Sequence, residues 1–227
     1  MTQKQAVFGL MGKRVMFNRG RYNPTSDAVW LAAFAPGGVK SVLDAGIGTG
    51  GVALCLMAHN PDVTVTGIDI SQNMLAECAE NARLNARAIN LINNDIITWK
   101  TDQTFDLVIT NPPYFKGTPA IHNAHHNADL TQWTTGCLRR VRPGGWFCTI
   151  VDAATVSEVI SKMHPRCGDI TIVPLFGAKN TAERVLIRAR AGSHGPTVLH
   201  RGLAMNCDAV LRDGLTIDQL LTTLNTL

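Results

Sequence analysis

Short apolar runs alternate with amphipathic segments along most of the chain. Val63–Asp69 and Phe105–Thr110 are rich in β-branched and aromatic residues, which predicts strands. Between them, Ser71–Asn85 has apolar residues at helical spacing and predicts a helix that Ser71 caps. The same criteria predict further strands at Ser41–Asp44, Asn90–Asn93, Trp146–Val151, Ile170–Phe176 and Arg184–Ala191. Further helices are predicted at Ser26–Ala35, Gly51–His59, Asp129–Arg140, Thr155–Met163 and Thr216–Leu224.

The order of these elements indicates the fold class. Continuously apolar strands that are separated by helices are typical of a parallel sheet covered on both faces. The last two strands are joined only by the loop Gly177–Glu183, which predicts an antiparallel hairpin at the end of the sheet. We therefore expect an α/β fold with a mostly parallel seven-stranded sheet, an antiparallel last strand, and helices on both faces.

Length and composition favour one globular domain. The chain has 227 residues, of which 45% are hydrophobic and 17% charged, so a large core can form. No apolar stretch reaches the roughly 18 residues that span a bilayer, so we expect no membrane segment. Nothing resembles an interdomain linker. Residues 1–227 are expected to form a single domain, with an N-terminal extension and helix at 1–40, a core at 41–191 and a tail at 192–227.

The net charge of +4 is unevenly distributed. Residues 1–26 carry five bases and no acid, residues 27–138 carry five bases and ten acids, and residues 139–227 carry eleven bases and seven acids. This pattern indicates an anionic partner held from the two ends, although solvated faces produce similar patterns. The six cysteines have no CxxC spacing, which predicts buried free thiols in a reducing cytoplasm and no metal site.

A glycine-rich loop follows the first core strand. Asp44 ends that strand, and three glycines follow at alternate positions, Gly46, Gly48 and Gly50. Glycine allows a ligand to approach the backbone closely, and ligands of open α/β sheets bind beyond the carboxyl ends of the strands. The spacing also satisfies the dinucleotide pattern G-x-G-x-x-G, so NAD remains an alternative. Asp69, at the end of the next strand, suits the ribose hydroxyls of either ligand.

Two acids extend this candidate cofactor site. Asp44 precedes the first glycine by two residues, where it suits the cationic aminoacyl end of S-adenosylmethionine (SAM) better than a pyrophosphate. Asp95 follows the third core strand and is placed to reach the adenine amino group of SAM, with the Ile96 backbone alongside. An Asx turn is the alternative role for Asp95.

The segment Asn111-Pro112-Pro113-Tyr114 directly follows a predicted buried strand. An amino nitrogen on a planar ring is a poor nucleophile because its lone pair is delocalised. Hydrogen bonds from its N–H groups to the Asn111 side-chain oxygen and the Pro112 carbonyl would return electron density to nitrogen. The prolines fix φ and hold that carbonyl in place, and Tyr114 could stack on a flat base. A proline-rich turn without chemistry is the alternative.

Together, LDAGIGTG, GIDI, NND and ITNPPY resemble class I SAM-dependent methyltransferases that act on planar amino or amide nitrogens. The flanking segments YNPTSDAVWLAAFAP, VPLFGAKNTAERVLIRARAG and LHRGLAMNCDAVLRDG are similar to the bacterial tRNA adenine-N6 methyltransferase family. Those enzymes modify the adenine just 3′ of the anticodon in a valine tRNA. The resemblance implies a Rossmann-like class I methyltransferase fold, SAM as cofactor, tRNA as partner and a cytoplasmic location.

The resemblance also implies roles for individual residues. The implied catalytic residues are Asn111, Pro112 and Tyr114. The implied cofactor-binding residues are Asp44, Gly46, Gly48, Gly50, Asp69, Ile70, Asp95, Ile96 and Asn111. The candidates for RNA contact are Arg19, Arg21, Lys116, Lys179 and Arg184, with Arg188 and Arg190 as further basic residues near the loop. The closing segment lacks the aromatic residue that relatives often carry near Met205-Asn206.

Several other functions remain open at this level. The same motif serves guanine-N2 methylation of ribosomal RNA and glutamine methylation of release factors. Only about forty residues precede the first core strand, which is short for the helical domain of the release-factor enzymes. From other classes, an NAD-dependent oxidoreductase and a non-catalytic RNA-binding module are the alternatives. Calorimetry with SAM and NAD separates the methyltransferase from the oxidoreductase, and the RNA-binding module would bind RNA without SAM.

Overall fold

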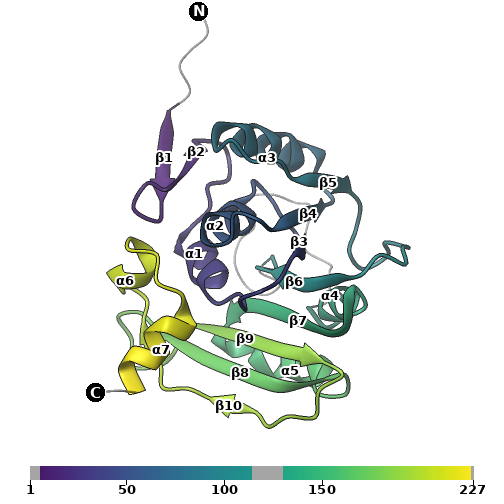
Figure 1. Cartoon of the computed structure of the whole chain (residues 1–227), viewed down its shortest axis with the longest axis vertical. Coiled ribbons are helices and arrows are strands. Elements are labelled where there is room, and N and C mark those ends of the chain that lie inside the picture. The colour runs from purple at the N-terminus through teal and green to yellow at the C-terminus, as the bar shows by residue number, and fades with distance from the viewer. Residues whose placement is uncertain (1–5, 114–129, 226–227) are drawn as a thin grey trace, which may run out of the picture.

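The computed structural model describes residues 6–113 and 130–225 and is built on one large sheet (Figure 1). Its strands lie in the order β10-β8-β9-β7-β6-β3-β4-β5, and β11 also pairs with β8. The seven long core strands are β3 (Ser41–Ala45), β4 (Thr64–Asp69), β5 (Asn90–Asn93), β6 (Phe105–Thr110), β7 (Val141–Asp152), β8 (Cys167–Phe176) and β9 (Arg184–Ala191). These seven confirm the strands predicted from the apolar runs.

Strand directions also follow the prediction. Strands β3 to β7 pair in parallel, whereas β9 is antiparallel to both of its neighbours, β7 and β8. The chain runs outward through β3, β4 and β5 and then returns to place β6 on the other side of β3. This reversal creates a topological switch point between β3 and β6, and a crevice for ligands forms at such a point beyond the carboxyl ends of the strands.

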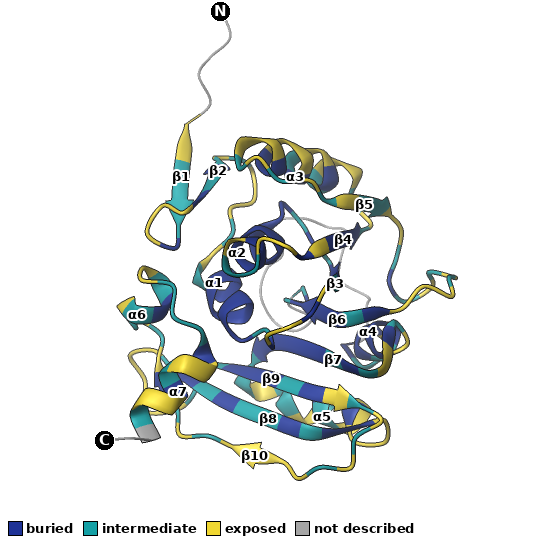
Figure 2. Ribbon diagram, in the orientation of Figure 1, coloured by how far each residue is buried: buried dark blue, intermediate teal, exposed yellow. Residues whose placement is uncertain are grey.

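Helices cover both faces of the sheet, as expected (Figures 1 and 2). Adjacent strand residues alternate between two cores, so Val42 packs in one core and Leu43 in the other. The first core includes side chains of α1 (Ser26–Ala33), α2 (Gly51–His59) and α3 (Gln72–Leu84). The second includes side chains of α4 (Leu130–Leu138) and α5 (Val156–Met163).

Local signals in the sequence explain several boundaries. The Ser71 hydroxyl accepts a hydrogen bond from the Met74 amide at 3.3 Å and caps α3, as predicted. Five of the six cysteines are buried and all six are free thiols, in agreement with the composition. Among the described helices, none is long and apolar enough to cross a membrane.

The sequence prediction missed three features of the strands. Two-residue strands β10 (Val198–Leu199) and β11 (Leu203–Ala204) extend it from seven strands to nine. A separate hairpin forms from β1 (Val7–Leu10) and β2 (Val15–Asn18). Strand β7 begins at Val141, before the predicted Trp146, because the Pro-Gly-Gly segment is accommodated within the strand where its pairing with β6 shifts register.

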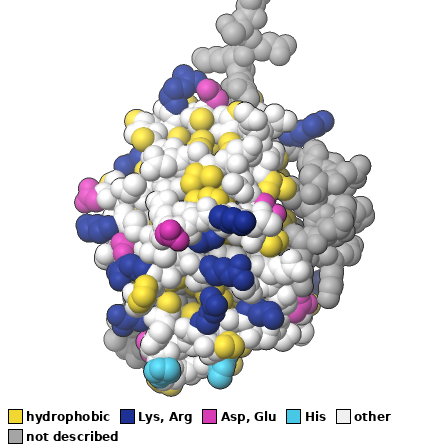
Figure 3. All heavy atoms as spheres, turned by 90° about the vertical axis from the view of Figure 1, so that its right-hand side faces the viewer, with side chains coloured by type: hydrophobic (Ala, Val, Ile, Leu, Met, Phe, Trp, Pro, Cys, Tyr) yellow, Lys and Arg dark blue, Asp and Glu magenta, His cyan; other side chains and the backbone are white. Residues whose placement is uncertain are grey.

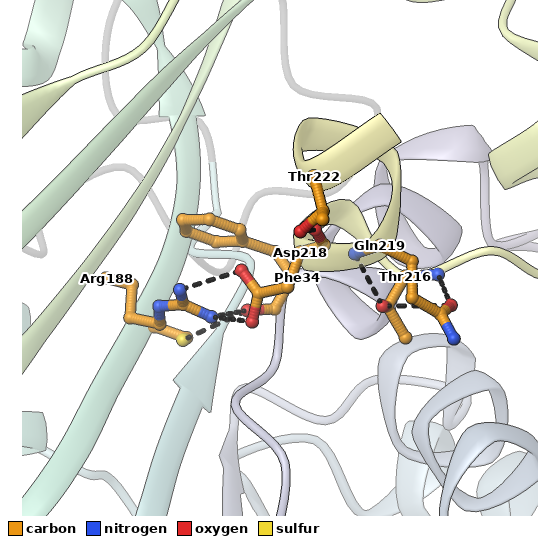
Figure 4. Close-up of polar contacts among 7 residues, drawn as sticks. Phe34, Arg188, Thr216, Asp218, Gln219 and Thr222 are labelled. Carbon is orange, nitrogen blue, oxygen red and sulfur yellow. Dashed lines mark hydrogen bonds and ion pairs between the residues drawn. The ribbon is translucent and has the colours of Figure 1, made fainter. Parts of the chain in front are cut away.

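The C-terminal tail ends in α6 (Asp208–Leu211) and α7 (Ile217–Asn225), and an arginine joins it to the core (Figure 4). The Arg188 guanidinium donates to both carboxylate oxygens of Asp218 at 3.0 and 2.9 Å and to the Phe34 carbonyl at 3.1 Å. It also lies 4.7 Å from the Phe34 ring centroid and 5.6 Å from that of Trp146. Arg188 was a candidate for RNA contact, but its guanidinium is engaged inside the protein.

We expect Arg188→Met to lower the free energy of unfolding by about 2–3 kcal/mol, since it removes charge-assisted hydrogen bonds and cation–π contacts at a largely buried site. Arg190→Met is the matched control. Arg190 lies on the same strand but is exposed, and it makes one hydrogen bond, to the Gly144 carbonyl, and one ring contact, with Trp146. Its loss should cost about 0.5–1 kcal/mol in urea denaturation. Equal losses would contradict the anchoring role of Arg188.

Candidate active site

The glycine loop and the Asn-Pro-Pro segment emerge from neighbouring strands at the switch point. In the pairing of β3 with β6, Asp44 lies opposite Ile109, so both strands end within a few residues of the same level. The Gly46 and Ile47 amides donate to the Ile68 carbonyl of β4 at 2.8 and 3.1 Å. The topology therefore brings together the two motifs that the sequence singled out, at one edge of the sheet.

Backbone geometry explains the glycines of the loop. Gly46, Gly48 and Gly50 all have positive φ, at +72°, +54° and +90°, a region that other residues rarely adopt. Among the described residues, a side chain at Gly48 would find no atom closer than the Gly46 carbonyl oxygen, 4.0 Å away, so the described part of the chain leaves this side of the loop open. Gly50 is packed instead, because a Cβ atom there would lie 2.9 Å from the Cys78 sulfur.

Asp69 holds the loop in this conformation. One carboxylate oxygen accepts from the Gly48 amide at 2.9 Å, and the other accepts from the Ser71 amide at 2.8 Å. The side chain is half-buried, so each oxygen keeps a lone pair for a further donor. The next residue, Ile70, is 45% exposed and leaves an apolar surface beside the carboxylate.

Asp44 is buried beneath the loop, with 1% of its surface exposed. One of its oxygens accepts from the Ala53 amide of α2 at 3.1 Å. Burial raises the pKa of the Asp44 carboxyl from 3.8 to about 7; the hydrogen bond from Ala53 opposes this rise, and the nearby Asp69 charge adds to it. A carboxyl with such a pKa is near half-protonated at neutral pH and would gain from a cationic ligand.

Asp44 should make stability depend on pH. Because its pKa is higher in the folded chain, the folded state binds more protons than the unfolded state between pH 3.8 and about 7. The contribution of this group to the free energy of unfolding therefore falls as pH rises through that window. We expect wild type to lose stability relative to Asp44→Asn across it, measured by urea denaturation at each pH. Parallel pH profiles would contradict the raised pKa.

The ends of the neighbouring strands complete this edge. The Asn93 side-chain amide donates to the Asp69 and Ile70 carbonyls, both at 3.0 Å, and ties β5 to β4. The Asp95 carboxylate accepts from the Ile97 amide at 2.9 Å, which is the Asx turn considered from the sequence. Asp95 stays half-exposed, so the turn leaves it accessible, while the Ile96 side chain is buried.

The Asn-Pro-Pro segment begins directly at the end of β6. Asn111 and Pro113 are half-buried, and Pro112 is buried. Neither proline carries an amide hydrogen, so strand pairing cannot continue through them and the chain leaves the sheet here. Tyr114 and Lys116 lie outside the described residues, as do the three histidines of the following segment.

The remaining candidates for RNA contact differ in their surroundings. Arg21 and Lys179 are exposed, and Arg19 is exposed with its guanidinium 5.3 Å from the Phe8 ring centroid. Arg184 instead donates to the buried Asp27 carboxylate at 3.1 Å and to Asp152 at 3.4 Å. Lys and Arg side chains also gather over the lower half of the face in Figure 3.

The residues at this edge fit SAM. An open, positive-φ glycine turn, a half-buried carboxylate, an exposed apolar side chain and a buried carboxyl provide surfaces for its aminoacyl, ribose and adenine parts. The sequence interpretation did not include Asn93, Thr110 or Trp133, which also connect the strands and helices here. Asn93 and Thr110 stand within the NND and ITNPPY motifs, but the hydrogen bonds that tie them and Trp133 to their neighbours appear only in the folded arrangement.

Comparisons with known proteins identify relatives of this chain. Relatives named tRNA1(Val) (adenine(37)-N6)-methyltransferase include one from Glaesserella parasuis, 34% identical over 61% of this chain and 63% of its own length. Another, from Escherichia coli O6:K15:H31, is 32% identical over 66% of this chain and 69% of its own length. The matched part thus spans about two thirds of these relatives.

Solved structures share the fold. A predicted O-methyltransferase from Agrobacterium tumefaciens superposes with a TM-score of 0.65 and 24% identity, over 79% of this chain and 88% of its own. A 16S rRNA N2 methyltransferase from T. thermophilus gives a TM-score of 0.59 and 20% identity, over 83% of this chain and 50% of its own. The family model of the methyltransferase small domain matches residues 9–161, which is more than half of the chain. This chain therefore belongs to the methyltransferase small domain family.

Proposed function

We propose that this protein transfers a methyl group from SAM to the N6 atom of an adenine in tRNA. The observation that carries the proposal is the placement of Asn111 and Pro112 at the end of β6, next to the glycine loop that ends β3. Methyl donor and acceptor would then meet at the switch point of the sheet. The family membership favours this reaction over an NAD-dependent oxidoreductase.

The residues that would hold SAM lie along the ends of three strands. The glycine loop, Gly46 to Gly50, and the Asp44 carboxyl would face its aminoacyl end. Asp69 would accept hydrogen bonds from the ribose hydroxyls, and Ile70 and Asp95 would lie against the adenine. When bound, SAM supplies a methyl group on a positively charged sulfur that is already a good leaving group. Positioning and electrostatics are then the main tasks of the protein.

The Asn-Pro-Pro segment would bind the acceptor. The Asn111 side-chain oxygen and the Pro112 carbonyl would accept the two N–H hydrogens of the adenine N6 amino group. These hydrogen bonds would favour a nitrogen lone pair that is less delocalised into the ring. As the N–C bond forms, the S–C bond of SAM would break and the nitrogen would lose one of its two protons to solvent. Tyr114, which follows at once in the sequence, would stack on the base after it has turned out of the RNA.

The proposal also names the RNA and the nucleotide that are methylated. The relatives' name specifies adenine 37 of a valine tRNA. Exposed Arg21 and Lys179 would contact RNA phosphates, and we expect the reaction to take place in the cytoplasm. Phosphate contacts of this kind make binding weaker as salt rises.

Methyl transfer from radiolabelled SAM to separate pools of tRNA, ribosomal RNA and release factor tests this proposal. We expect label in tRNA, recovered as N6-methyladenosine. Label in ribosomal RNA as N2-methylguanosine would favour a ribosomal RNA guanine-N2 methyltransferase. Label only in protein would favour a release-factor glutamine methyltransferase. No methylation of any pool, together with no calorimetric SAM binding, would overturn the cofactor assignment as well.

A further inference from the structure

One buried hydroxyl links the cofactor loop, the Asn-Pro-Pro strand and helix α4. Thr110 is the last residue of β6, directly before Asn111, and is 1% exposed. Its hydroxyl donates to the Ala45 carbonyl at 2.7 Å. The same oxygen accepts from the indole N–H of Trp133 at 3.0 Å. The hydroxyl thus donates one hydrogen bond and accepts another, and the two consecutive hydrogen bonds join α4 to β6 and β6 to β3.

The position of these two hydrogen bonds matters because the backbone pairing between β3 and β6 ends there. The last paired residues of β3 and β6 are Asp44 and Ile109. Beyond Asn111, the two prolines have no amide hydrogen to continue the ladder. The Thr110 hydroxyl therefore supplies the link between the two strands at the level where each releases its functional loop.

Trp133 adds a second contact to the same junction. It lies on α4, the first described element after the Asn-Pro-Pro segment, and is 8% exposed. A Cβ atom at Gly46 would lie 2.9 Å from its six-membered ring, so the ring packs directly against the first glycine of the cofactor loop. The indole thus contacts the cofactor loop with its ring and the acceptor strand with its N–H group.

We propose that Thr110 and Trp133 are positioning residues that set the distance between the cofactor loop and the Asn111-Pro112 acceptor site. The inference rests on the proposed methyltransferase function and adds to it two residues that the proposed contacts with SAM and adenine do not include. Methyl transfer requires close and aligned approach of two atoms that are held by different strands, and a misplacement of about 1 Å can cost roughly 100-fold in rate. A fixed link between those strands meets this requirement.

Thr110→Val tests the link, because valine has nearly the same shape but neither donates nor accepts. We expect kcat to fall about 10–100-fold while the Kd for SAM stays within about threefold, since SAM-binding groups are kept and only alignment is lost. Thr110→Ser restores the hydroxyl and should recover most of kcat. Thr66→Val is the matched control, because Thr66 is a buried strand threonine in β4. A loss in kcat equal to that of the control would overturn the proposal.

Nuclear magnetic resonance of the tryptophan indole N–H groups gives a readout that needs no RNA. Trp133→Phe assigns the Trp133 signal by removing it. In Thr110→Val that signal should move toward the position of an indole without a hydrogen bond, and Thr66→Val should leave it in place. An unmoved signal in Thr110→Val would overturn the proposal whatever the RNA substrate is.

Trp133→Phe also tests the coupling, because phenylalanine retains a ring against Gly46 but loses the N–H donor. If the two residues act as one link, the double variant with Thr110→Val should lose little more kcat than Thr110→Val alone. If the fold-loss in kcat of the double variant equals the product of the two single losses, Thr110 and Trp133 act independently. That result would overturn their joint role. If wild type fails to methylate tRNA while the indole signal responds to Thr110→Val and to added SAM, the tRNA assignment fails and the link stands.

Discussion

Asn111→Ala is expected to lower kcat by at least about 100-fold, the loss typical when a preorganised hydrogen-bonding group is removed from a transition state. The side-chain oxygen would no longer draw a hydrogen bond from the N6 amino group, so the lone pair would stay delocalised in the ring. The Kd for SAM, measured by calorimetry, should change less than about threefold, because the glycine loop and Asp69 are untouched. Single-turnover transfer to tRNA reports the chemical step directly.

Asn60→Ala is the matched control for that variant. Asn60 ends α2, and its side-chain amide donates to the Val39 carbonyl at 3.1 Å, before the start of β3 and away from the carboxyl ends of the strands. The control also removes an asparagine side-chain hydrogen bond, one that Asn60 donates, but it should keep kcat near wild type. Equal loss of SAM affinity and kcat in Asn111→Ala would show that Asn111 binds the cofactor rather than activating the acceptor.

Asp69→Ala is expected to weaken SAM binding by at least about 100-fold, which corresponds to the loss of one or two charge-assisted hydrogen bonds. In the structure the carboxylate holds the Gly48 and Ser71 amides, so its removal also releases the loop that would cradle the cofactor. Calorimetry with SAM measures the effect without RNA. At saturating SAM, kcat should recover in part, because the acceptor site is intact.

Asp62→Ala provides the comparison for the loss of a negative charge. Asp62 is exposed just before β4, at the opposite end of the strand from Asp69. Its removal changes the net charge equally but touches no loop at the switch point. SAM affinity that falls equally in both variants would mean that overall charge, and not the Asp69 contacts, controls binding.

Much of this fold was predictable because its determinants are local. The apolar runs at Thr64–Asp69 and Phe105–Thr110 form strands within a residue of their predicted bounds, and Ser71 caps α3 as its residue type suggests. The carboxyl ends of parallel strands meet at one edge of a sheet, so the positions of the motifs also followed from strand order. Both features depend on patterns that span few residues.

The features that were missed depend on tertiary context. Strands β10 and β11 are two residues long, and their pairing with β8 gives them their conformation. Arg188 has the same residue type as an RNA-binding arginine, but burial beneath the tail pairs it with Asp218. Thr110 stands in the ITNPPY motif, but no sequence pattern links it to Trp133, and only the approach of α4 to the sheet brings the indole to the hydroxyl.

Mapping the methylated nucleoside in tRNA tests the central claim most directly. Purified valine tRNA is incubated with SAM and the protein, cut with a base-specific ribonuclease, and analysed by mass spectrometry. A parallel tRNA carries guanosine in place of the adenosine just 3′ of the anticodon. We expect one N6-methyladenosine at that adenosine, none in the substituted tRNA, and none with Asn111→Ala. Methylation of the substituted tRNA, or a methyl group on any atom other than adenine N6, would contradict it.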